Sequence, residues 1–155
     1  MKLSTREDIS APIDEVFEAL CEFESFERQA MRRGIEVQRT DQLKKAGVGA
    51  RWKIAFDMRG RKRDLALEVV QFEKPNEMTF AGKSSGIEAS FVIELIALSR
   101  SRTRMSVALD FKPLNLSARL LVQSLKLAKS NLTKRFKLRV ADYAKSLEDR
   151  LQRTS

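Results

Sequence analysis

The feature that most constrains the fold is a long apolar stripe near the C-terminal end of the chain. Between Leu114 and Leu151, large apolar side chains recur at steps of three, four or seven, which places them on one side of an α-helix. No Gly or Pro interrupts this stretch, so it predicts one amphipathic helix of roughly 50 Å that needs a broad apolar cover. The members of the stripe are Leu114, Leu121, Leu125, Leu132, Phe136, Val140, Tyr143, Leu147 and Leu151.

Strand-like segments before Pro113 can supply that cover. The first is Lys2–Ile9, and the clearest is Arg51–Met58, in which apolar residues alternate with polar ones. Short turns separate most of these segments, which predicts an antiparallel meander. Further strands are expected at Ile35–Arg39, Leu65–Phe72, Met78–Gly82, Ala89–Leu95 and Met105–Phe111.

Two short helices are expected directly after the first strand. Pro12 followed by two acids marks a helix start, and a second helix is expected to end near Gly34. The sequence therefore predicts a single α+β domain over residues 1–155. Its architecture would be a curved antiparallel sheet of about six to seven strands around a long C-terminal helix.

Composition excludes several kinds of chemistry. The chain has no His and one Cys, Cys21, so the usual zinc sites, Ser-His and Cys-His nucleophiles and an internal disulfide are unavailable. We predict no catalytic residue, no metal and no cofactor. The N-terminal residues lack the apolar core of a signal peptide and no segment has 18 apolar residues, so we expect a cytoplasmic protein.

The net charge of +9 is concentrated near the C-terminal end. Residues 114–155 hold ten Lys or Arg against three acids, and a second basic cluster comprises Arg59 and Arg61–Arg63. Such charge attracts anionic membrane surfaces and polyanions, although a solvated helix face would carry the same residues. Nucleic-acid binding is the least favoured partner class, because no exposed aromatic residues are interleaved with these charges.

Three stretches carry a resemblance to a known family. Asp8–Phe17 resembles the family's entry into its first helix, Gly47–Trp52 its glycine-bearing start of a central strand, and Val69–Pro75 its strand ending in a proline turn. The chain resembles the START-related, polyketide cyclase/dehydrase-like superfamily, often labelled SRPBCC. This resemblance implies a helix-grip fold with an elongated cavity between sheet and terminal helix that holds lipids, polyketides or other apolar molecules.

The inward halves of the alternating strands and of the helix stripe would form the walls of that cavity. A filled core would use the same residues, since burying each large side chain contributes roughly 1.5–3 kcal/mol, so the cavity itself is an implication of the resemblance. The predicted wall consists of Trp52, Ile54, Phe56, Met58, Phe91, Ile93, Met105, Val107, Leu125, Leu132 and Phe136.

Three polar residues are candidate anchors for a ligand. Glu7 is the one acid at a strand position whose side chain is expected to point inward, and Arg139 and Tyr143 lie on or near the helix stripe. Paired carboxylates are common at functional sites, and Arg135 and Arg139 are the candidate partners of Glu7, but a solvated residue at a strand edge is the preferred explanation. Cys21 is most simply a small core residue.

A second set of leucines lies off the main stripe. Leu116, Leu120, Leu127 and Leu138 stand among lysines, which is typical of a membrane-surface face or of a weak homodimer contact. The leading interpretation remains non-catalytic binding of a hydrophobic small molecule, such as a lipid, an isoprenoid or quinone, or a polyketide. The alternatives are a polyketide cyclase/dehydrase-like enzyme and a regulatory or membrane-surface interaction module.

Overall fold

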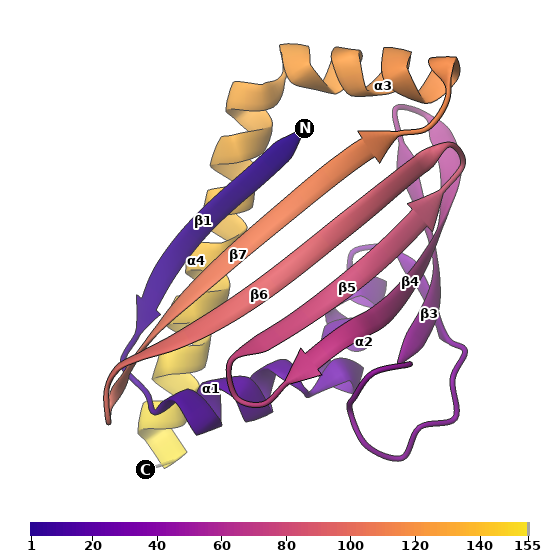
Figure 1. The fold of residues 1–155 in the computed structure, drawn as a ribbon. Coiled ribbons are helices and arrows are strands. Elements are labelled where there is room, and N and C mark those ends of the chain that lie inside the picture. The colour runs from indigo at the N-terminus through magenta and orange to yellow at the C-terminus, as the bar shows by residue number, and fades with distance from the viewer. Residues whose placement is uncertain (155) are drawn as a thin grey trace.

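A computed structural model describes residues 1–154, which form one seven-stranded sheet and four helices (Figure 1). All neighbouring strands are antiparallel, in the order β1-β7-β6-β5-β4-β3-β2. The strands are β1 (Lys2–Ile9), β2 (Glu36–Arg39), β3 (Arg51–Met58), β4 (Arg61–Glu73), β5 (Glu77–Ser84), β6 (Ile87–Ser99) and β7 (Arg102–Pro113). The helices are α1 (Ile13–Leu20), α2 (Phe23–Arg32), α3 (Leu116–Leu127) and α4 (Lys129–Thr154).

The predicted α+β architecture is confirmed, and the period-two pattern located the strands well. The first strand and Arg51–Met58 have the predicted bounds, whereas β4 begins four residues before the predicted Leu65. Charged residues fill those four positions, so apolar periodicity could not detect them. The hairpin between β3 and β4 therefore reaches further than the sequence suggested.

The predicted single helix over 114–151 is wrong in one respect, because the chain turns sharply at Ala128. Helix α3 crosses one end of the sheet, while α4 runs along one face beside β1 (Figure 1). Leu121 and Leu125 are half-buried on α3 and Leu132 is half-buried on α4, so two helices of different direction share the predicted stripe. Leu114, predicted as a stripe member, precedes the helix and is exposed.

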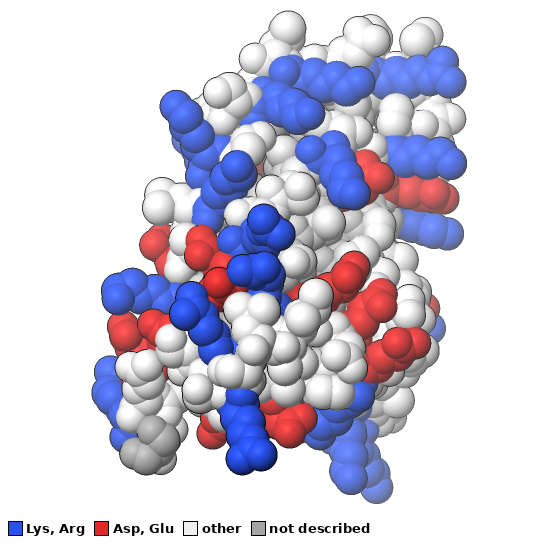
Figure 2. Space-filling model, turned by 60° about the vertical axis from the view of Figure 1, so that its left-hand side comes forward, with Lys and Arg blue, Asp and Glu red and all other residues white. Residues whose placement is uncertain are grey.

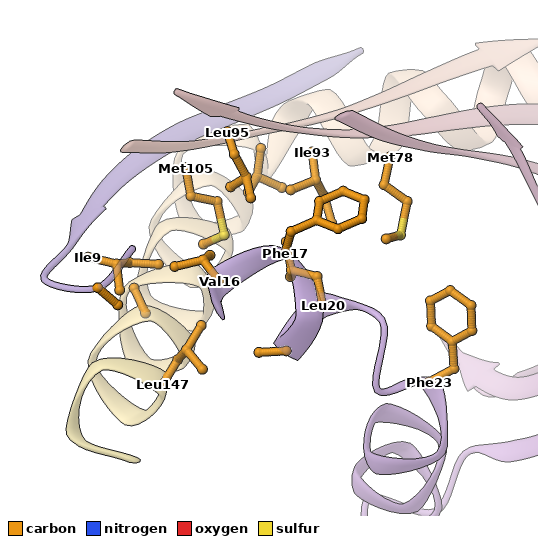
Figure 3. Close-up of a cluster of buried hydrophobic side chains, with 14 of the residues drawn as sticks. Ile9, Val16, Phe17, Leu20, Phe23, Met78, Ile93, Leu95, Met105 and Leu147 are labelled. Carbon is orange, nitrogen blue, oxygen red and sulfur yellow. The ribbon is translucent and has the colours of Figure 1, made fainter. Parts of the chain in front are cut away.

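We call the sheet face that holds α1 and α4 the inner face. The hydrophobic core fills the end of this face near α1, where side chains from the sheet, α1 and α4 point toward one another (Figure 3). Phe17 from α1 lies at its centre, and its ring packs edge-on against Phe72 with 5.2 Å between ring centroids. This end of the inner face is therefore closed by packed side chains.

Candidate functional site

The end of the inner face near α3 is packed differently from the end near α1. Leu3, Ala118 and Val122 are buried at this end, but its other apolar side chains are only half-buried, although strand register places those of the sheet on the same face as the core. We call this set the open wall. It consists of Ile54, Phe56, Met58, Leu65, Phe91 and Phe111 from the sheet and Leu121, Leu125, Leu132 and Phe136 from α3 and α4.

The structure divides the predicted cavity wall between these two ends. Trp52, Ile93, Met105 and Val107 are buried in the core. Trp52 owes its burial to α2, because Phe23 packs edge-on against the indole at 5.1 Å between ring centroids. The other seven predicted residues belong to the open wall and are half-buried, although Ile54, Phe91 and Phe136 also pack against the core.

Helix α3 is held over the open wall by the turns of two hairpins. The Arg59 guanidinium, at the β3–β4 turn, donates to Ser124 Oγ. At the β5–β6 turn, the Leu114 amide donates to the carbonyl oxygen of Gly86 at 2.7 Å. Asn115 Oδ1 then caps the helix by accepting from the Ala118 amide at 2.8 Å. These loop contacts, together with the burial of Ala118 and Val122, position α3.

Gly86 makes this arrangement sterically feasible. Its φ is +71°, and a Cβ at this position would lie 2.3 Å from the Asn115 side-chain nitrogen. A larger residue would therefore displace the capping side chain that starts α3.

The charged residues of the sheet's inner face do not converge. Register places Glu7 on β1 opposite Met105, Arg61 and Arg63 on β4, and Arg39 on β2. Strand β1 lies four places from β4, and Glu7 lies near the α1 end of the sheet whereas Arg63 lies near the β3–β4 turn at the other end. Among residues 1–154, no ion pair joins Glu7 to Arg135 or Arg139. An acid and base pair is therefore not assembled on this face.

Arg39 belongs to a network that fixes α2 and the loop before β3. Its guanidinium pairs with the Asp41 carboxylate and lies over the Trp52 ring, 5.2 Å from the centroid. Asp41 also accepts from the amides of Leu43 and Arg51 at 2.9 and 2.7 Å. The Arg39 hydrogen bond, assisted by these amides, holds the pKa of Asp41 far below its usual range.

Two surface hollows lie outside the open wall. One of about 240 Å³ lies between α2 and α4 and includes Arg139 and Tyr143, two of the three predicted anchors. Phe26 packs against the Tyr143 ring at 5.5 Å, and burial raises the pKa of the phenol. The other hollow, of about 340 Å³, lies beside Arg39. Neither hollow is lined by an open-wall residue.

Cys21 borders the second hollow as an unactivated thiol. Burial is the main reason that its pKa is raised to about 11. The thiol is therefore protonated near neutral pH, in keeping with the predicted structural role. Within residues 1–154, no group of three His, Cys, Asp or Glu side chains could hold a metal ion.

Comparisons with solved structures show which fold this is. Protein TTHA0849 from Thermus thermophilus aligns over 100% of this chain and 99% of its own, with a TM-score of 0.68 and 16% identity. The Zhui aromatase/cyclase from Streptomyces sp. R1128 aligns over 97% and 95%, with a TM-score of 0.67 and 12% identity. A START superfamily protein from Mycobacterium smegmatis aligns over 86% and 95%, with a TM-score of 0.56 and 12% identity. The chain has the START-related helix-grip fold.

Sequence comparison alone gives no such assignment. No protein-family model matches the chain, and no curated protein matches it in sequence. The helix-grip fold is thus shared with these structures at only 12–16% sequence identity.

Helix α3 gives this helix-grip chain an unusual surface. Leu116, Leu120 and Leu127 are 72, 62 and 92% exposed, and Leu138 of α4 is 62% exposed. From residue 111 to residue 141 the chain has eight Lys or Arg and no acid. Figure 2 shows the upper end as blue and white side chains, with red ones beginning lower down. None of the described helices is long and apolar enough to cross a membrane.

Proposed function

We propose that this protein binds an apolar small molecule on the open wall, between the sheet and helices α3 and α4, without catalysing a reaction. The observation that supports this function is the difference between the two ends of the inner face. Full burial of a large apolar side chain contributes roughly 1.5–3 kcal/mol to stability. Each open-wall side chain is only half-buried, so part of this free energy is still available from further burial. A ligand that completed the burial of this set would gain on the order of several kcal/mol.

Binding is better supported than catalysis. The chain shares its fold with an aromatase/cyclase, but a fold hosts many functions and the residues must carry the chemistry. On the inner face of the described sheet, Glu7 and Arg63 lie on strands four places apart and at opposite ends, so these two charged groups do not converge on one substrate atom. A lipid, an isoprenoid or quinone, or a polyketide-like molecule would suit this mainly apolar surface.

A space-filling substitution on α4 tests this function. We expect Leu132→Trp to weaken binding of 1-decanol at least tenfold in isothermal titration calorimetry, because the indole would occupy the ligand's place. The melting temperature should stay within about 3 °C of wild type, since a filled core would instead resist the added volume. Leu138→Trp, on the exposed side of the same helix, should bind 1-decanol as wild type does. Wild-type affinity in Leu132→Trp, or no binding by the wild type, would contradict the proposal.

A second candidate function is docking of α3 on an anionic membrane. The exposed leucines of α3 provide apolar groups, and the acid-free segment 111–141 provides the charge that anionic lipids attract. The same helix covers the open wall, so docking would bring a membrane-derived ligand to its binding surface.

Paired charge substitutions test this docking. The Leu120→Asp, Leu127→Asp variant should lose at least tenfold in affinity for phosphatidylglycerol vesicles in a sedimentation assay. The Ile96→Asp, Leu98→Asp variant alters two exposed apolar residues outside the helices and should retain vesicle binding. Equal vesicle binding by all three proteins refutes docking. A later elution of only the α3 variant in gel filtration, without vesicle binding by the wild type, would instead identify these leucines as a dimer contact.

A further inference from the structure

Arg61 and Arg63 both project from β4 toward the inner face, but only Arg63 is half-buried there. Arg63 lies on β4 opposite Phe56 of β3, and antiparallel partners project to the same face, so Arg63 faces inward. It is half-buried, whereas its neighbours Lys62 and Asp64 are exposed. In the sequence, Arg63 stands out only as a member of the basic cluster with Arg59, Arg61 and Lys62.

The guanidinium of Arg63 is incompletely satisfied. Its Nε is the only buried side-chain nitrogen or oxygen of the described, non-exposed residues that lacks a hydrogen-bond partner. Among residues 1–154, no ion pair includes Arg63, although the adjacent Lys62 pairs with Glu36 at 3.4 Å on the outer face. Proteins rarely leave a buried donor unpaired, because the group loses its hydration without compensation.

The surroundings of Arg63 favour an anionic partner. Arg59, Arg61 and Lys62 belong to the same hairpin, and α3 above it has Arg119 and Lys126 but no acid. Glu7, the one acid on the inner face of the sheet, is too distant to pair with it. A planar guanidinium in such a place is suited to bidentate hydrogen bonds with a carboxylate or a phosphate.

The apolar residues beside Arg63 define the rest of the ligand. Phe56 is its cross-strand partner, and Leu65 and Ile54 follow on the same face toward the core. We propose that Arg63 anchors the anionic head of an amphiphile, a carboxylate or phosphate monoester, whose apolar tail lies on the open wall. This inference rests on the proposed function and specifies its ligand class.

The test compares three ligands with one tail. Decanoate, decyl phosphate and 1-decanol are titrated into the wild type, Arg63→Gln and Lys62→Gln at pH 7 by calorimetry. The wild type should bind both anions at least tenfold more tightly than 1-decanol. Arg63→Gln should lose that preference while its affinity for 1-decanol stays within about twofold of wild type. Lys62→Gln makes the same charge change on the opposite face and should keep the preference, because exposed charges are screened.

The outcomes separate the anchor from the binding function. If the wild type binds all three ligands equally, or Arg63→Gln retains the anion preference, the anchor is refuted and apolar binding stands. If Arg63→Gln weakens all three ligands equally, Arg63 has a structural role only. If none of the ligands binds the wild type, both proposals fail. The melting temperature of Arg63→Gln should remain within about 3 °C of wild type, which excludes unfolding as the cause of a lost preference.

Discussion

Replacing Phe17 with Ala is expected to lower the free energy of unfolding by about 3–5 kcal/mol. The ring is 1% exposed at the centre of the core and packs on Phe72, so its removal leaves a cavity among side chains from the sheet, α1 and α4. Replacing Phe56 with Ala should lower it by only about 1 kcal/mol, since that ring is half-buried on the open wall. Urea denaturation followed by circular dichroism measures both values.

The same two variants should show opposite effects on ligand binding. Phe56→Ala is expected to weaken 1-decanol binding at least tenfold, because it removes part of the binding surface. Phe17→Ala, measured at a temperature where it stays folded, should bind close to wild type. Equal losses of stability at the two positions would contradict the account, since they would mean that the inner face is one continuously packed core.

Replacing Asp41 with Ala is expected to lower the free energy of unfolding by roughly 1.5–3 kcal/mol near pH 7. The substitution removes the acceptor for the Arg39 guanidinium and for two backbone amides, and the Asp41 side chain is only 3% exposed. Asp57→Ala, which removes an exposed carboxylate from β3, should change stability by less than about 0.5 kcal/mol.

The loss at Asp41 should depend on pH in a defined direction. The folded-state pKa lies below the ordinary value of 3.8, chiefly because of the Arg39 hydrogen bond. A depressed carboxyl pKa contributes stability that is fully present above the unfolded pKa and is lost as the pH falls toward the folded one. The difference between wild type and Asp41→Ala should therefore be constant above about pH 5 and shrink below pH 4. A difference that grew on acidification would contradict the assigned ion pair.

The strands could be predicted from the sequence because each strand has its own alternation of apolar and polar residues. In β3, every second residue from Trp52 to Met58 is apolar, and all of them face inward. The break at Ala128 carries no such signal. The turn between α3 and α4 lets one helix cover the end of the sheet and the other its face, and these positions exist only once the sheet has formed. The start of α3, by contrast, has a local cause, because Asn115 caps the helix and Leu114 therefore precedes it.

The division of the wall into a packed and an open end could not be predicted either. Burial of Trp52 depends on Phe23, which a different helix brings against the indole. Arg63 was within reach of the sequence, because it continues the alternation of Leu65, Leu67 and Val69 toward the turn. A charged residue within a basic run is typical of an exposed surface, so the run does not indicate that Arg63 faces inward.

The bulge after Val69 changes which residues of β4 face inward, so that Phe72 rather than Gln71 is half-buried.

Methyl NMR during a titration with 1-decanol tests most directly whether the open wall binds an apolar molecule. We expect chemical-shift changes at the methyl groups of Met58 and Leu132 on the open wall, with little change at Met105 and Leu147 in the core. No shift at Met58 and Leu132, or shifts confined to the exposed Leu127, would contradict the claim that the open wall is a binding surface.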